Sequence, residues 1–323
     1  MIVTVTANPA VDVTYRVSEL VLGTALRVRS VHRQAGGKGV NVARVLRSMG
    51  VEVLALAPVG GATGGEIRAD LERSGIRHEL VPVRAASRQT VTAVDDRGRS
   101  IELDEPGAAL TSLEWERLLA AAASQLRAGG VVALSGSLPP GAPADGYGVL
   151  VELAHRRGAT VVLDTSGAAL EAALAAGPDV VKPDEAELST FYGAGVGSPQ
   201  SALEACQKLL QAGAGAVVAS RGELGALVRS AEAAWWISHG ARSGNAVGAG
   251  DALVAGLASG LEQGLPLVDS AHRGVLWAYA SLASDFAGCV DPDEVERQRD
   301  AITLASVEDP RVVPLSRGRT KEA

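Results

Sequence analysis

From residue 51 onward, short apolar runs alternate along the chain with longer segments of helical periodicity. The runs that predict strands cover residues 51–59, 76–83, 131–135, 160–163, 180–181 and 216–220. The segments that predict helices cover residues 63–74, 113–126, 202–212, 250–263 and 267–285. When a helix follows each strand, the chain returns in the same direction and helices cover both faces of a parallel sheet. The pattern therefore predicts a three-layer α/β/α fold with a mostly parallel central sheet.

Two segments break this rhythm, because their residues alternate between apolar and polar types. Residues 13–34 form the first, and residues 89–103, with a turn at 95–98, predict a hairpin. We expect a small separate sheet that covers the ligand site as a lid. The predicted division is a main domain of residues 1–12, 35–87 and 105–315, with a lid of residues 13–34 and 88–104 inserted into it. A sheet with an open face buries a substrate or pairs with a second subunit, so we also predict a homodimer through the lid.

Charge and composition restrict the partners of the chain. A net charge of −7 over 323 residues, with no basic stripe, argues against a nucleic-acid partner. Small anions remain candidates, because a few local donors bind them. No run reaches membrane-spanning length and the first residues lack a signal-peptide pattern, so no membrane partner is expected. The two cysteines, Cys206 and Cys289, are too few for a disulfide framework, which favours a cytoplasmic location.

A glycine turn at residues 248–251 comes directly before an apolar segment of helical periodicity. Glycine lets the backbone approach a ligand closely. The first amides of a helix lack internal partners and carry the positive end of its dipole, so they suit phosphate. Asp251 in the same turn is placed to take a proton from a hydroxyl. The turn predicts phosphoryl transfer to an alcohol, although an ordinary helix start with flexible glycines has the same local pattern.

Polar residues also follow the first strand and open the first helix. Asn8 and Asp12 come directly after the N-terminal apolar run, and residues 36–41 read Gly-Gly-Lys-Gly-Val-Asn. This is not a Walker loop, because no Ser or Thr follows Lys38. Its glycines let backbone amides and Asn41 approach a polyhydroxy ligand. The alternative is a glycine-rich turn with a solvated lysine.

Further polar turns end the later strands, at residues 135–137, 164–167, 182–185 and 220–222. Each one alone also fits an ordinary βα turn with a helix cap. The carboxyl ends of parallel strands share one edge of the sheet, and open α/β sheets bind ligands there. Their recurrence therefore predicts one binding site at that edge.

Six motifs, at residues 8–12, 36–41, 135–141, 164–167, 181–183 and 248–251, together resemble those of the ribokinase-like (PfkB) carbohydrate kinases, in the branch of 1-phosphofructokinase and tagatose-6-phosphate kinase. The resemblance runs in order through nearly the whole chain. It implies a ribokinase-like fold with a β lid, and a sugar-phosphate kinase that uses ATP and Mg²⁺. Fructose 1-phosphate is the first candidate substrate, and tagatose 6-phosphate or fructose 6-phosphate is the alternative.

The resemblance also implies roles for individual residues. For catalysis, a general base and an anion hole match Asp251 and the amides of Gly248, Ala249 and Gly250. For the sugar phosphate, the matching positions are Asp12, Gly37, Lys38, Asn41, Ser137 and, as the arginine that binds its phosphate, Arg88. For the nucleotide, they are Lys182, Ser220, Gly222 and Gly225. For a water-mediated Mg²⁺ site, they are Asp184 and Glu187.

Four positions depart from the family pattern. Asp184 stands in place of an asparagine, Ala246 of a threonine and Ala252 of a serine, and Ala25 stands where the 6-phosphofructokinase branch has a lysine. The missing hydroxyls keep a non-catalytic sugar- or nucleotide-binding protein open as an alternative. A kinase of an unphosphorylated sugar or nucleoside is the other alternative, and Arg88 argues against it.

Overall fold

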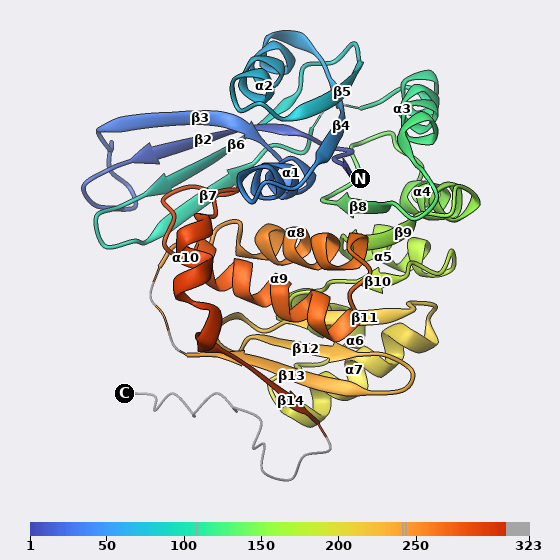
Figure 1. Ribbon diagram of the computed structural model, residues 1–323. Coiled ribbons are helices and arrows are strands. Elements are labelled where there is room, and N and C mark those ends of the chain that lie inside the picture. The colour runs from blue at the N-terminus through green and yellow to red at the C-terminus, as the bar shows by residue number, and fades with distance from the viewer. Residues whose placement is uncertain (108, 241, 243, 308–323) are drawn as a thin grey trace.

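The computed structural model describes residues 1–107, 109–240, 242 and 244–307. Residues 308–315 of the predicted main domain lie outside them. Its centre is a ten-stranded sheet in the order β14-β13-β12-β11-β10-β9-β8-β1-β4-β5 (Figure 1). From β11 to β5 all neighbours are parallel, as predicted. These strands are β1 (Ile2–Val5), β4 (Val53–Val59), β5 (Arg77–Pro82), β8 (Val131–Ser135), β9 (Thr160–Asp164), β10 (Val180–Val181) and β11 (Ala216–Ser220).

Helices cover both faces of this sheet because its strands are apolar on both sides. In β8, Val131 and Ala133 join one core, and Val132 and Leu134 join the other. The first core includes side chains of α1 (Lys38–Ser48), α2 (Gly61–Arg73), α8 (Ala249–Glu262) and α9 (Leu267–Ser281). The second includes side chains of α3 (Ser112–Gln125), α4 (Gly146–Arg156), α5 (Gly167–Leu174), α6 (Glu185–Tyr192) and α7 (Pro199–Gln211). The predicted three layers are confirmed.

A second, four-stranded sheet lies beside the first in the order β3-β2-β6-β7 and is called the small sheet below (Figure 1). Its strands are β2 (Ala10–Arg16), β3 (Ser30–Gly36), β6 (Arg88–Val94) and β7 (Ser100–Asp104). The hairpin prediction is confirmed, because β6 and β7 pair antiparallel. Val11 and Val13 on one face of β2 are buried in the first core, which leaves Asp12 on the opposite face. The division of the chain into a main domain and a lid unit stays a prediction.

The far edge of the large sheet differs from the prediction, because β12 (Ala226–Arg229), β13 (Ala234–His239) and β14 (Ile302–Ser306), which were not predicted, pair antiparallel there. Among the described residues, no helix separates β12 from β13, and three α-helices in succession separate β13 from β14, so neither connection follows the regular alternation of one strand and one helix. The short helices α5, α6 and α10 (Pro292–Arg297) were missed as well, because one to two turns carry little periodicity. None of the described helices has the length and apolarity needed to cross a membrane.

Candidate active site

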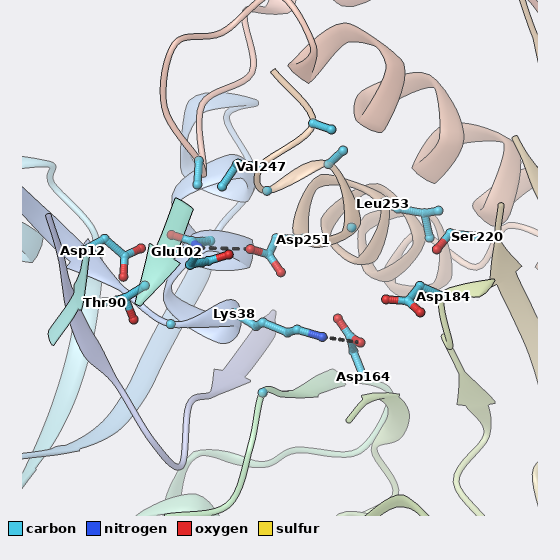
Figure 2. Close-up of a pocket in the computed structure, with 18 of the residues that line it drawn as sticks. Asp12, Lys38, Thr90, Glu102, Asp164, Asp184, Ser220, Val247, Asp251 and Leu253 are labelled. Atoms are coloured by element: carbon cyan, nitrogen blue, oxygen red, sulfur yellow. Dashed lines mark hydrogen bonds and ion pairs between the residues drawn. The ribbon is translucent and has the colours of Figure 1, made fainter. Parts of the chain in front are cut away.

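A cavity of about 1530 Å³ lies between the carboxyl ends of the parallel strands and the polar face of the small sheet (Figure 2). All the site residues predicted from the sequence line it, namely Asp12, Gly37, Lys38, Asn41, Arg88, Ser137, Lys182, Asp184, Glu187, Ser220, Gly222, Gly225, Gly248, Ala249, Gly250 and Asp251. The strand-end motifs are therefore brought together in space.

The turn before α8 has the shape that its glycines predict. Gly248 is the N-cap of the helix in a left-handed conformation, with φ of 82°. The amide of Ala249 already donates to the carbonyl oxygen of Ala246 at 3.1 Å. In the described part of the chain, the amides of Gly248, Gly250 and Asp251 have no acceptor. These three amides, rather than that of Ala249, are the donors that the turn offers to an anion.

Asp251 lies in the first turn of α8 and is 6% exposed. Its Oδ2 accepts a hydrogen bond of 3.0 Å from Nδ2 of Asn41, which fixes the carboxylate (Figure 2). Burial raises the pKa of Asp251 to about 7, and the negative charge of Asp164 adds to this rise. The charges of Lys38 and Lys182 and the hydrogen bond from Asn41 oppose it. A carboxylate with a pKa near neutrality is suited to general base catalysis.

Two lysines converge on Asp164 on the floor of the cavity. Nζ of Lys38 lies 3.2 Å and Nζ of Lys182 lies 3.3 Å from the same Oδ1 atom of Asp164. Lys38 also lies 3.5 Å from Oε1 of Glu187. Burial alone would lower the pKa of Lys38, but the charges of Asp164, Glu187 and Asp251 outweigh it and raise that pKa. Lys38 is therefore held as a cation at this end of the cavity, and Nζ of Lys182 lies beside Gly250 of the Gly248 turn.

Asp164 is the first residue of the polar turn at residues 164–167, and its sequence pattern predicts no individual role for it. It is 1% exposed, and its Oδ2 atom has no hydrogen-bond partner in the described residues. The signal that could have identified it is its place directly at the end of β9. Its lysine partners come from α1 and from the segment after β10, and no sequence spacing indicates that these meet.

The small sheet presents a row of polar side chains to the cavity. Asp12, Thr90 and Asp104 are register partners on adjacent strands, and Glu102 on the next row faces the same way. Burial raises the pKa of Asp12 to about 7; Arg88 opposes this and Glu102 adds to it. Glu102 and Asp104 were not predicted as site residues. Strand alternation shows that they share a face, but it does not show which face the cavity lies on.

Two polar groups at the base of the small sheet are fixed by backbone contacts. Arg88 donates from Nε to the carbonyl oxygen of Asn8 at 3.2 Å and from Nη1 to that of Glu105 at 3.0 Å. The Asn8 side chain in turn donates from Nδ2 to Oγ of Ser137 at 3.1 Å. These two carbonyl oxygens orient the guanidinium of Arg88, and its charge also opposes the rise that burial causes in the pKa values of the nearby carboxylates of Asp12 and Glu102.

The acidic pair at the start of α6 forms a capping box. The amide of Glu187 donates to Oδ1 of Asp184 at 2.8 Å, and the amide of Asp184 donates to Oε2 of Glu187 at 2.9 Å. Each carboxylate therefore uses one oxygen to hold the helix start. Within the described residues, no group of three or more His, Cys, Asp or Glu is arranged to hold a metal ion.

The far end of the cavity has features suited to a larger ligand. Ser220 is the last residue of β11 and Gly222 follows that strand. Gly225 has φ of 85°, and the carbonyl oxygen of Ile237 lies so close to it that no Cβ fits. Across from them, the guanidinium of Arg242 lies 5.3 Å from the ring centre of Tyr279. The sequence analysis assigned no role to Arg242 or Tyr279, because neither belongs to a recurring motif.

Comparison with known proteins decides the family. The model of the pfkB family of carbohydrate kinases matches residues 5–292. The chain belongs to this family. The kinase is 36% identical to a 1-phosphofructokinase from Xanthomonas campestris, over 94% of this chain and 98% of the relative. It is 38% identical to a 1-phosphofructokinase from Rhodobacter capsulatus, over 95% and 98%. The resemblance predicted from the motifs is confirmed.

Solved structures confirm the fold of the kinase. Phosphofructokinase-2 from Escherichia coli in complex with potassium superposes with a TM-score of 0.86 at 29% identity, over 92% of this chain and 97% of that one. The same enzyme in complex with fructose-6-phosphate gives 0.83, at 29% identity and with the same coverage. A ribokinase from Thermotoga maritima gives 0.73 at 18% identity, over 93% and 99%, which supports the ribokinase-like fold alone.

Proposed function

We propose that the kinase transfers a phosphoryl group from ATP to fructose 1-phosphate and forms fructose 1,6-bisphosphate. The observation that carries this proposal is the Gly248 turn, where a carboxylate with a pKa near 7 and amides without acceptors lie together. The polar row of the small sheet faces this turn across the cavity. The two 1-phosphofructokinase relatives support the choice of substrate. Tagatose 6-phosphate and fructose 6-phosphate remain the alternatives.

In this reaction Asp251 accepts the proton of the acceptor hydroxyl as its oxygen bonds to the γ-phosphorus of ATP. The bond from that phosphorus to the bridging oxygen breaks, and ADP leaves with its electron pair. The charge on the transferred group is met by the amides of Gly248, Gly250 and Asp251 and by Lys38. Such transfers need little covalent help, so positioning and charge neutralisation dominate. Asp164 serves by holding Lys38 in place.

The sugar phosphate is bound between α1 and the small sheet. The carboxylate of Asp12 accepts hydrogen bonds from its hydroxyl groups, and the side-chain amide of Asn41 exchanges hydrogen bonds with them. At Gly37 the absence of a side chain lets the sugar approach the backbone closely. Ser137 lies at the same end of the cavity as Arg88, which pairs with the phosphate because a guanidinium suits phosphate oxygens. The lid interpretation of the small sheet is part of this proposal.

The nucleotide lies along the strand ends toward β11, with Lys182, Ser220, Gly222 and Gly225 around its phosphates. Mg²⁺ usually keeps several waters and binds one or two carboxylates plus substrate phosphates. The capping box leaves Oδ2 of Asp184 and Oε1 of Glu187 for such contacts, and Oε1 of Glu187 also lies 3.5 Å from Nζ of Lys38. Asp184 and Glu187 therefore fit a Mg²⁺ ion that arrives bound to ATP. When bound, this ion would neutralise part of the negative charge of the phosphates. A carboxylate in place of the family's asparagine at position 184 adds negative charge there.

The structure weakens one argument for a non-catalytic protein. Ala252, which stands in place of a serine, is fully buried in the first core and does not line the cavity. A hydroxyl at this position would not face the transferred phosphate. Ala246 does line the cavity, and it supplies the carbonyl that holds the Ala249 amide.

A substrate panel tests the proposed function. Initial rates of ADP formation with Mg²⁺ are compared for fructose 1-phosphate, fructose 6-phosphate, tagatose 6-phosphate, free fructose and a nucleoside. We expect the highest kcat/KM with fructose 1-phosphate. A preference for free fructose or the nucleoside would contradict the proposal, and binding without turnover across the panel would favour the non-catalytic alternative.

Replacing Arg88 with alanine should raise KM for the sugar phosphate by about 10-fold to 100-fold, since a charge-assisted phosphate contact is lost. KM for ATP should stay nearly constant. Steady-state kinetics with each substrate varied in turn measures both. Arg97→Ala is the matched control, because Arg97 lies in the turn of the same hairpin and does not line the cavity. If the KM for ATP rises as much as the KM for the sugar phosphate, Arg88 does not bind the phosphate of the sugar.

We also propose that two copies pair through the small sheet. Its face opposite the cavity leaves apolar side chains uncovered at the edge strands: Val31 is 56% exposed and Leu103 is 63% exposed. Sedimentation equilibrium should give twice the chain mass of 32.9 kDa, and Leu103→Glu should return the protein to a monomer. A monomer with the native sequence would exclude this pairing.

A further inference from the structure

The small sheet is fastened to the loop that follows α9. His32 on β3 stacks on Phe286, with ring centroids 3.9 Å apart and planes at 24°. Two residues along the same strand, Gln34 donates from Nε2 to the carbonyl oxygen of Ala287 at 3.0 Å, and Gln34 is buried. We call these two contacts the latch. An exposed ion pair of 2.9 Å between Arg16 and Asp285 accompanies them, although exposed pairs contribute little.

The latch shares a strand face with the residues proposed to hold the sugar. Gln34 is the register partner of Asp12 on β2, and His32 is the partner of Thr14. Asp12, Thr14 and Gln34 all line the cavity. A ligand that fixes Asp12 therefore also restricts the position of Gln34 across one backbone ladder.

On its other side, the latched loop lies directly against the Gly248 turn. A Cβ at Gly248 would come within 2.9 Å of Cα and Cβ of Ala287, so the two backbones are already in contact. Asn245, just before the turn, donates from Nδ2 to the carbonyl oxygen of Asp285 at 3.1 Å. Its Oδ1 accepts from the amide of Val247 at 3.1 Å.

The same loop also contacts the helix that fixes the proposed base. A Cβ at Gly288 would come within 2.9 Å of Cδ of Arg44 and 3.4 Å of Cα of Asn41, and Asn41 holds Asp251. The loop is therefore packed between the Gly248 turn and α1. If it moves, both the amides of the turn and the partner of Asp251 lose their support.

We propose that Gln34 and Phe286 are positioning residues that couple the sugar site to the phosphate-binding turn. This inference rests on the function proposed above, and it adds a route between the two substrates. When the sugar phosphate holds the small sheet in place, the latch presses the loop of residues 285–288 against Gly248. The amides of the turn are then set before ATP arrives. Coupling between two sites is reciprocal, so each substrate tightens the binding of the other.

The test measures that coupling without turnover. Calorimetry gives the affinity of a non-hydrolysable ATP analogue with Mg²⁺, first alone and then with saturating fructose 1-phosphate. In the native protein we expect the sugar phosphate to tighten analogue binding by about 5-fold to 150-fold, the usual range for coupled sites. In Gln34→Met and Phe286→Ala, the ratio between the analogue affinities with and without fructose 1-phosphate should fall to about twofold or less, and this ratio measures the coupling whatever each affinity becomes.

Arg33→Ala is the matched control, because Arg33 lies between His32 and Gln34 and makes an exposed ion pair with Glu66 on α2. It should keep the native coupling factor. Melting temperatures of all variants show whether a loss comes from unfolding. Latch variants that keep the native factor, or a native protein without coupling, would overturn the proposal. If no sugar phosphate in the panel binds the native protein, the proposed function itself fails, which is a different outcome from binding without coupling.

Discussion

Replacing Asp251 with asparagine should lower kcat by about 10²-fold to 10⁴-fold, the usual contribution of a general base. Asparagine keeps the shape of the side chain and an oxygen for the Asn41 hydrogen bond, but it cannot take a proton at neutral pH. The affinity for ATP should change little, because the backbone amides of the turn are untouched. Steady-state kinetics with fructose 1-phosphate, together with nucleotide binding by calorimetry, separates the two effects.

The control for this variant is Asp269→Asn. Asp269 is also a carboxylate in the first turn of a helix, α9, but it is exposed and does not line the cavity. It should keep native activity. Native-like turnover in Asp251→Asn would show that another group accepts the proton.

The pH dependence is a second readout of the same residue. Because the pKa of Asp251 is raised to about 7, the base is protonated below that pH and ionised above it. For the native enzyme, kcat/KM should therefore fall about tenfold per unit on the acid side of pH 7 and level off above it. Asp12 has a similar pKa, so the acid limb becomes steeper if it must also be ionised. A profile flat from pH 5 to 8 would contradict the role of Asp251.

Replacing Gly248 with alanine should lower kcat by about 10²-fold to 10³-fold, the scale seen when a donor to developing charge is lost. The left-handed conformation of Gly248 disfavours any side chain by about 1–2 kcal/mol. The added methyl group would also meet the backbone of Ala287. The turn must shift, and its amides then leave the transferred phosphate. Single-turnover rates with saturating substrates measure the effect on chemistry alone.

Gly264→Ala separates strain from function. Gly264 follows the other end of α8 with φ of 75°, and an added Cβ has no atom within 4 Å. It should lose stability of about 1–2 kcal/mol from backbone strain and keep its kcat. If Gly248→Ala behaves like this control, the turn does not bind the transferred group.

The sequence predicted the parallel core and the gathering of the site for the same physical reason. Apolar strands such as 131–135 must be covered on both faces, and helices between them force the chain to return in parallel. That topology brings the strand ends to one edge, so residues as far apart as Asp12, Lys182 and Asp251 meet there. The glycine turn at 248 adds a local geometry that a side chain could not adopt.

The sequence could not show features that depend on the direction of side chains or on contacts between distant segments. Lys38 and Lys182 share one oxygen of Asp164, but the rotamers that make this possible are set by packing from three separate elements. Glu102 points into the cavity because Val91 and Leu103 occupy the opposite face of the small sheet, which pattern alone left open. The contact between Gln34 and Ala287 joins segments about 250 residues apart, with no motif in either.

The central claim is that the Gly248 turn and Asp251 direct the γ-phosphoryl group of ATP to a hydroxyl of fructose 1-phosphate. The most direct measurement is ³¹P NMR of a reaction containing the native kinase, ATP, Mg²⁺ and fructose 1-phosphate. The account predicts that a second sugar phosphomonoester resonance appears together with ADP in equal amounts, and that Asp251→Asn prevents this. Release of inorganic phosphate with unchanged fructose 1-phosphate, or no reaction at all, would contradict it.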